Sequence, residues 1–143
     1  MVGIVLITHG TMGDEFLKVS SKIYGQPKQV ITVPILPEDG KGVANEKLKK
    51  AIAQTDTGEG VLILTDGFGG SPTNICMNIF KDYNCEIVTG LNLSMLLEVL
   101  CYQDKSGLKE LAQRAISGGN RGIVHASELF RQKLSQVTES KSS

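Results

Sequence analysis

Short hydrophobic runs alternate along the chain with longer segments in which apolar residues recur at helical spacing. This alternation is typical of an α/β protein built on a parallel sheet. Four runs rich in β-branched residues predict buried strands at residues 2–8, 29–35, 60–65 and 86–89. The sequence therefore predicts a three-layer α/β/α fold with a mostly parallel central sheet.

Helices are predicted between these strands and after the last of them. Thr11 and Asp14 predict a capping box at the start of the first helix. Ser71, followed by Pro72, and Ser94 predict caps for two later helices. The apolar positions that predict the buried helix faces are Met12, Phe16, Val19 and Ile23; Ala44, Leu48, Ala51 and Ile52; Pro72, Ile75, Cys76, Ile79 and Phe80; Met95, Leu96, Leu97, Val99 and Leu100; and Leu108, Leu111, Ala112, Ala115 and Ile116.

The C-terminal part of the chain changes character after these helices. Gly118-Gly119 predicts the end of a helix, and residues 122–125 predict a short fifth strand. A last helix is expected over residues 126–136. The polar residues 138–143 are expected to be disordered.

The composition is that of an ordinary globular protein without a strong charge preference. Of the 143 residues, 41% are hydrophobic and 21% are charged, and the net charge is zero. These values exclude a disordered composition and give no general attraction to nucleic acid or to an anionic membrane. The length fits one domain, expected over residues 1–137.

Compartment and redox state are constrained by the hydrophobic runs and the cysteines. No run approaches the length of a membrane span, and the first lacks the basic flank and cleavage site of a signal peptide. We therefore expect a cytoplasmic protein without membrane insertion. Cys76, Cys85 and Cys101 match no metal motif, and their apolar surroundings predict buried free thiols.

Two of the predicted strands end in polar loops that suit phosphoryl chemistry. Thr8-His9-Gly10 follows the first strand, and Asp66 follows the third. Because the carboxyl ends of parallel strands share one edge of a sheet, we expect His9 and Asp66 to lie close together. One imidazole nitrogen of His9 is then a nucleophile, while Asp66 accepts a hydrogen bond from the other and sets the tautomer.

The glycine-rich segment after Asp66 predicts a loop that surrounds a phosphoryl group. Its glycines allow several backbone N–H groups to turn toward phosphate oxygens, and the Ser71 hydroxyl suits either a phosphate contact or a helix cap. The predicted site residues are His9 and Asp66 as the catalytic pair, and Gly67, Phe68, Gly69, Gly70 and Ser71 as the phosphate-binding loop.

Cationic side chains are missing from both loops, and this absence separates two kinds of protein. The chain has no nucleotide-binding loop with lysine and no obvious carboxylate cluster for magnesium. Kinases and phosphatases normally surround the transferred group with cations. A relay protein can leave part of that charge to its partners. We therefore expect a phosphoryl relay that needs no metal and no organic cofactor.

Each of these features also has a purely structural interpretation. A histidine after a strand is often merely exposed, a glycine loop before a helix is often only a tight connection, and Asp66 can be an ordinary loop acid. His125 lacks comparable neighbours in the sequence and is interpreted as a structural or surface residue. The apolar stretch 95–100 fits a core better than an interface.

Three motifs together resemble the mannose-family enzyme IIA component of the bacterial sugar phosphotransferase system. They are Thr8-His9-Gly10, the segment from Asp66 to Asn74, and the segment from Gly90 to Glu98. The resemblance extends from the first strand to the glycines near Gly122. The occurrence of all three motifs in this order is specific.

The resemblance implies a phosphohistidine relay. The histidine matching His9 takes a phosphoryl group from the histidine-containing phosphocarrier protein and passes it to a IIB component. The acid matching Asp66 pairs with the imidazole, and the loop matching residues 69–71 surrounds the phosphate. The resemblance also implies a homodimer that exchanges a strand, which here falls near residues 122–125.

Two positions depart from the family pattern, and other functions stay open. Family members often carry a bulky or hydroxylated residue at Gly67 and a proline at Ser94, so the partner is less well defined than the chemistry. A histidine phosphatase or mutase is disfavoured because Thr8 stands where those enzymes place arginine. A regulatory phospho-switch without a transporter and the IIA-like subunit of dihydroxyacetone kinase remain alternatives. The sugar is not encoded in this chain, which we expect to be a separate IIA polypeptide.

Overall fold

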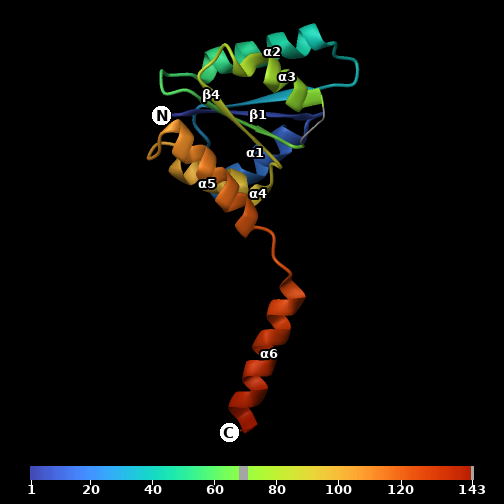
Figure 1. Cartoon of the computed structure of the whole chain (residues 1–143), viewed down its shortest axis with the longest axis vertical. Helices are drawn as coiled ribbons and strands as arrows, with labels where there is room; N and C mark the ends of the chain where they lie inside the picture. The colour runs from blue at the N-terminus through green and yellow to red at the C-terminus, as the bar shows by residue number, and fades with distance from the viewer. Residues whose placement is uncertain (68–70, 143) are drawn as a thin grey trace.

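A parallel sheet forms the middle layer of the computed structural model, which describes residues 1–67 and 71–142 (Figure 1). All four predicted strands are confirmed, and each pair of neighbours is parallel. In sheet order β2-β1-β3-β4, the strands are β2 (Val30–Ile35), β1 (Gly3–His9), β3 (Val61–Thr65) and β4 (Cys85–Thr89).

Helices cover both faces of this sheet. They are α1 (Met12–Ile23), α2 (Lys41–Thr55), α3 (Ser71–Phe80), α4 (Leu93–Tyr102), α5 (Leu108–Arg121) and α6 (Ala126–Ser142). In Figure 1, α2 and α3 lie on one side of the strands and α1, α4 and α5 on the other. The predicted three-layer α/β/α fold is therefore confirmed. No helix in the described ranges combines the length and the apolar character that a membrane crossing requires.

Two hydrophobic cores form because successive side chains of a strand point to opposite faces. Val5 and Ile7 of β1 pack with the buried residues of α2 and α3. Ile4 and Leu6 pack on the opposite face with the buried residues of α4 and α5. The central strands are thus buried on both faces, which explains why they read as continuous hydrophobic runs.

The strand order creates a topological switch point at the carboxyl ends of β1 and β3. The chain leaves β1 toward β2 on one side, then crosses back over β1 to reach β3 on the other. The connections after β1 and β3 diverge, so the carboxyl edge between them is open. Ligands of open α/β sheets bind at such an edge.

Two of the predicted helix caps are wrong. Thr11 precedes α1 but makes no side-chain capping bond, and the Asp14 carboxylate accepts a hydrogen bond from the Thr32 hydroxyl on β2 instead. At α4 the cap is Asn92, whose side chain accepts a hydrogen bond from the Met95 N–H at 2.8 Å. Ser94 lies within the helix, since an asparagine two residues earlier already satisfies the free N–H group.

The predicted buried faces are confirmed for α2 and for most of α3, α4 and α5, but not for α1. Met12, Val19 and Ile23 are exposed, because α1 turns Gly13, Ser20 and the half-buried Phe16 and Leu17 toward the sheet. Phe80 and Ile116 are exposed as well. Helical periodicity finds an apolar stripe but does not say what covers it.

Gly118-Gly119 does not end α5 as predicted, since the helix continues to Arg121. A Cβ on Gly118 would lie 2.5 Å from Glu98 Cβ, and one on Gly119 would lie 2.9 Å from Met95 Cε. The two glycines therefore allow α5 to pack closely against α4. From the sequence, a glycine pair is interpreted as a helix end. The need for small residues at 118 and 119 comes from the side chains of α4, which the local sequence does not reveal.

The C-terminal segment differs from its prediction in two respects. Residues 122–125 form no strand in the described chain, because they lead away from the sheet and meet no strand edge. The last helix, α6, continues to Ser142 instead of ending at residue 136, so residues 138–142 are helical. Figure 1 shows α6 projecting away from the sheet and the other helices.

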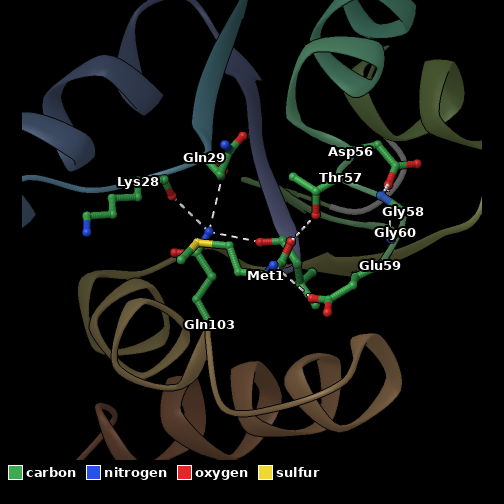
Figure 2. Close-up of polar contacts among 10 residues, drawn as sticks. Met1, Lys28, Gln29, Asp56, Thr57, Gly58, Glu59, Gly60 and Gln103 are labelled. Carbon is green, nitrogen blue, oxygen red and sulfur yellow. Dashed lines mark hydrogen bonds and ion pairs between the residues drawn. The ribbon is translucent and has the colours of Figure 1, made fainter.

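Gln103 closes the amino edge of the sheet, opposite the switch point (Figure 2). Its buried Nε2 atom donates hydrogen bonds to Val2 O at 2.9 Å and Lys28 O at 2.8 Å. At the same edge the Met1 ammonium pairs with Glu59 at 2.9 Å. Polar contacts at this edge therefore hold the starts of β1 and β2 to the end of α4.

The three cysteines are free, as predicted. Cys76 and Cys85 are buried and Cys101 is half-buried. Burial raises the pKa of Cys76 to about 12, which keeps this thiol protonated near neutral pH. Cys76 is therefore a core residue and not a nucleophile.

Candidate active site

His9 is the last residue of β1 and lies at the carboxyl edge of the sheet. The next residue, Gly10, has a φ of +56°, a conformation that glycine adopts without a steric penalty. The Gly10 N–H donates to Ile35 O at 2.8 Å, which ties the loop to the end of β2. The turn thus directs the chain into α1 and leaves the His9 side chain 59% exposed.

Thr8 fixes this turn from inside. Its buried hydroxyl accepts a hydrogen bond from the Gly13 N–H at 3.0 Å and donates one to Gly10 O at 3.3 Å. One of the unpaired N–H groups at the start of α1 is therefore satisfied by the residue before His9. The same hydroxyl positions both the helix and the histidine.

The predicted pair of His9 and Asp66 is brought together across β1 and β3. His9 Nδ1 lies 2.9 Å from Asp66 Oδ2, and the His9 backbone N–H donates to the same oxygen at 3.2 Å. The Asp66 side chain is only 10% exposed. Two bonds from one residue to one carboxylate oxygen hold the imidazole in a defined orientation.

The protonation of this pair follows from the surroundings of Asp66. Burial by itself raises the pKa of this carboxyl, but the hydrogen bonds from the His9 ring and backbone outweigh burial, so the pKa of Asp66 is lowered. An ionised carboxylate has no proton to donate, so Nδ1 carries the hydrogen of the bond. In the neutral imidazole the free lone pair is then on Nε2.

The start of the glycine loop is held by a threonine of α3. The buried Thr73 hydroxyl donates a hydrogen bond to Gly67 O, which fixes the chain directly after Asp66. Ser71 opens α3, and its exposed side chain lines a pocket that also contains His9. The predicted loop residues Phe68, Gly69 and Gly70 lie outside the described residues.

A pocket of about 450 Å³ lies beside His9. One wall is the loop from Leu36 to Gly40 after β2, and the other is the face of α3 that carries Asn74 and Asn78. Apolar side chains such as Ile35 and Ile75 form part of the lining. Within residues 1–67 and 71–142 no cluster of His, Cys, Asp and Glu side chains could hold a metal ion.

Sequence reasoning missed the β2 side of this pocket. Asp39 lines the pocket, and its carboxylate accepts hydrogen bonds from the Leu36 N–H at 3.0 Å and Lys47 Nζ at 2.8 Å. The hydrogen bond from Lys47, followed by that from Leu36, lowers the pKa of Asp39. The sequence does place the loop of residues 36–40 at the carboxyl end of β2. It does not show that β2 lies beside β1, and only this strand order brings the loop next to His9.

His125, the second histidine, is exposed in the segment before α6, as the sequence analysis predicted for a surface residue. Unlike His9, it does not end a strand, and no contact between its ring and a carboxylate is found in the described part of the chain.

Comparison with known proteins identifies related sequences over most of the chain. Residues 3–116 match the family model described as "PTS system fructose IIA component", in which PTS stands for phosphotransferase system. The chain is 32% identical over 124 residues to the mannose-specific EIIAB component of the PTS of Escherichia coli K12, a match that covers 85% of this chain and 38% of that relative. The chain therefore spans well under half the length of that relative.

A Bacillus subtilis relative of similar size is the fructose-specific EIIA component of the PTS. It is 31% identical over 112 residues, which cover 78% of this chain and 77% of the relative.

Solved structures agree with these matches. The phosphotransferase system component EIIA of Streptococcus agalactiae superimposes with a TM-score of 0.83 at 25% identity, covering 90% of this chain and 99% of that one. The mannose/sorbose-specific IIA subunit of Enterococcus faecalis gives a TM-score of 0.78 at 27% identity, with coverages of 86% and 92%.

Proposed function

The chain belongs to the PTS family described as the fructose IIA component, and from this membership we propose that it is a phosphohistidine relay protein. In this proposal His9 accepts a phosphoryl group from the histidine-containing phosphocarrier protein. It then passes the group to a IIB component during sugar uptake. Asp66 is the residue that orients His9.

One observation carries this proposal: the bond between His9 Nδ1 and Asp66 Oδ2 at 2.9 Å. Nδ1 is occupied by this hydrogen bond, and Nε2 has no hydrogen-bond partner among the described residues. The His9 side chain is exposed at the switch point of the sheet, so the imidazole of another protein can approach it. A relay needs this combination of a fixed ring and an accessible nitrogen.

The transfer step follows from this arrangement. The lone pair of His9 Nε2 attacks the phosphorus of the carrier's phosphohistidine and forms a new N–P bond. The carrier's own N–P bond breaks, and its electron pair returns to the carrier's imidazole nitrogen. The Nδ1 proton stays in the bond to Asp66, whose negative charge offsets the positive charge that develops on the ring. The same step, with the IIB component as acceptor, releases the group.

The loop of residues 67–71 is proposed to surround the phosphoryl oxygens. Supporting this, Gly67 directly follows Asp66 and its carbonyl is held by Thr73, while Ser71 lines the pocket beside His9. The N-terminus of α3 also presents the positive end of a helix dipole to an anion. In this proposal backbone N–H groups and the Ser71 hydroxyl bind the oxygens, and no cofactor is required.

The relatives favour the sugar relay over the subunit of dihydroxyacetone kinase. Their names describe PTS components for mannose and fructose. A regulatory protein would use the same phosphohistidine, so it differs in the acceptor and not in the site.

We also propose a homodimer. Met12, Val19 and Ile23 of α1 are exposed, and α6 carries Phe130, Leu134 and Val137 on one exposed face. Large apolar stripes of this kind usually mark a protein contact. A second copy of the chain, receiving α6 and residues 122–125 of the first, would cover both surfaces.

The relay is tested by phosphorylation from phosphoenolpyruvate through enzyme I and the phosphocarrier protein. The wild type, His9→Ala and His125→Ala are compared by intact mass. We expect the wild type and His125→Ala to gain one acid-labile phosphoryl group and His9→Ala to gain none. His125→Ala is the matched control, because it removes the second of the two histidines.

A phosphorylated His9→Ala protein would contradict the proposal. So would an unmodified wild type in the presence of a phosphocarrier shown to be charged.

A further inference from the structure

The pocket beside His9 contains one cation that the site described above does not use. Lys41 is the first residue of α2 and lines this pocket together with His9 and Ser71. Its side chain is exposed, and none of the ion pairs among residues 1–67 and 71–142 involves it. The two loops at the ends of β1 and β3 have no lysine or arginine. The β2 side of the pocket therefore contributes the missing charge.

The other charges around the pocket are already balanced. The Asp39 carboxylate, which lines the same wall, is paired with Lys47 at 2.8 Å. Asp66 is bonded to His9 at 2.9 Å. A phosphoryl group on His9 would add roughly one and a half to two negative charges next to the Asp66 carboxylate. Lys41 is the cation in this wall whose charge is not taken up by a neighbour.

The backbone around Lys41 is open. Gly40 and Gly42 flank it, and a Cβ on either would meet no atom within 4 Å. Gly40 has a φ of −77°, so its conformation does not require glycine either. The helix has no acidic residue in its first turn and no side-chain cap. An anion in the pocket thus meets a lysine, the start of a helix dipole and no competing carboxylate of α2.

We propose that Lys41 is the cationic partner of the phosphoryl group carried by His9, an inference that rests on the proposed relay function. Its flexible four-carbon stem brings the ammonium to the phosphoryl oxygens from the wall opposite α3. The positive charge stabilises the negative oxygens during transfer and in the phosphorylated protein. The chain then supplies part of the charge that its loops lack.

The test compares Lys41→Gln, Lys41→Arg and Lys50→Gln with the wild type. Lys50 is the matched control, since it is an exposed lysine of α2 that does not line this pocket. The first measurement is the rate of phosphorylation by the charged phosphocarrier protein. The second is a ³¹P NMR titration of each purified phosphoprotein, without any partner present.

We expect Lys41→Gln to slow phosphorylation roughly three- to tenfold, which is the size of effect for one partly screened charge near the reacting group. The phosphoryl pKa should rise, because the dianion has lost a nearby cation. Lys41→Arg should restore most of both values, and Lys50→Gln should behave like the wild type.

Three results would overturn the inference, and they are distinguishable. If Lys41→Gln phosphorylates and titrates like the wild type, Lys41 has no role at the phosphoryl group. If the rate falls but the titration of the isolated phosphoprotein is unchanged, Lys41 contacts the carrier protein instead. If the wild type itself gains no phosphoryl group, the proposed relay function fails, and the inference fails with it.

Discussion

At the scale of single residues, one carboxylate oxygen of Asp66 determines how His9 is presented. It accepts hydrogen bonds from both the ring and the backbone of His9, at 2.9 and 3.2 Å. The bond to the ring determines that Nδ1 carries the proton. The bond to the backbone N–H holds the main chain of His9 against the same carboxylate. A neutral amide in place of the carboxylate would keep the shape but lose the charge that offsets a developing imidazolium.

Asp66→Asn is therefore expected to fold and to accept the phosphoryl group about 10- to 100-fold more slowly, the range found when the hydrogen-bond partner of a metal-bound histidine is removed. Rates of phosphorylation by the charged carrier measure this, with circular dichroism as the check on folding. Asp66→Ala should be at least as slow. Loss of the fold in both variants would make Asp66 a structural residue instead.

The pH dependence of stability has a definite sign at this pair. The pKa of Asp66 is lowered from its ordinary value of 3.8, so the ionised carboxylate stabilises the folded state fully above that value. The stabilisation is lost as the pH falls through the lower folded-state pKa. The free energy of unfolding should differ between wild type and Asp66→Asn by about 1–2 kcal/mol near neutral pH. Urea titrations should find the two proteins converging in acid, and a constant difference would argue against an ionised pair.

At the scale of elements, the start of α1 depends on a residue of the preceding strand. The Thr8 hydroxyl satisfies the Gly13 N–H, whereas Thr11, at the usual capping position, makes no side-chain cap. Thr8→Val keeps the side-chain shape but leaves that buried N–H unpaired. We expect a loss of about 1–3 kcal/mol of unfolding free energy, since an unsatisfied buried donor has this cost.

Thr11→Ala is the matched control for Thr8→Val and should change stability by less than about 0.5 kcal/mol, as an exposed substitution. Thr8→Val should also slow phosphorylation, because the turn that presents His9 loses its internal support. Chemical denaturation and the phosphorylation assay measure the two effects. Equal stability of the two variants would mean that the Thr8 hydroxyl contributes no more to the start of α1 than Thr11 does.

The packing of α4 against α5 depends on glycine at 118. In an open helix glycine to alanine stabilises, but a Cβ here would lie 2.5 Å from Glu98 Cβ. Gly118→Ala should therefore lower the free energy of unfolding by about 1–3 kcal/mol through overpacking. Gly42→Ala in α2, where a Cβ would meet nothing within 4 Å, should raise it by about 0.4–1 kcal/mol. Thermal or urea unfolding tests both, and a stabilising Gly118→Ala would show that the helices separate easily.

At the scale of the whole molecule, the buried Gln103 contacts and the proposed site of phosphorylation lie at opposite ends of the parallel strands. Gln103 ties α4 to the starts of β1 and β2 at the amino edge (Figure 2), while His9 lies at the carboxyl edge. Gln103→Leu should lower the unfolding free energy by about 1–3 kcal/mol, because it leaves the buried Val2 carbonyl and the partly buried Lys28 carbonyl without this donor. The phosphorylation rate of the folded protein should stay within about twofold, given the distance across the sheet.

Gln54→Leu, an exposed glutamine of α2, is the control for Gln103→Leu and should leave stability nearly unchanged. Unfolding curves and the phosphorylation assay, both run well below the unfolding transition, separate the two properties. A folded Gln103→Leu protein with a strongly reduced rate would indicate that the two edges are coupled.

The unpartnered apolar surfaces give a prediction about assembly. Phe130 is 61% exposed on α6, and burying it in a dimer would contribute about 1.5–3 kcal/mol. Phe130→Glu should therefore shift the protein toward monomer, as measured by light scattering across a concentration series. Gln132→Glu adds the same charge on the opposite face of α6 and should leave the dimer intact. A wild type that is monomeric at every concentration would contradict the proposed dimer.

The local parts of this fold were predictable from the sequence by itself. The strands β1 to β4 are each recognised by a short hydrophobic run, because burial on both faces of a central parallel strand leaves that pattern. The helices follow from apolar spacing, and the free cysteines from their apolar surroundings. His9 and Asp66 were expected to lie close together because parallel strands share their carboxyl edge, and the distance of 2.9 Å shows that they do.

Only the tertiary structure decided which surfaces meet. The sheet order placed β2 beside β1 and brought Asp39 and Lys41 to the pocket of His9. The same assembly exposed the apolar stripe of α1 and buried Gly118 against α4. Periodicity along a chain records that a residue is apolar or small, a property of one segment. Which neighbour it packs against depends on segments far away in the sequence, and is set only when the sheet and its two helical layers assemble.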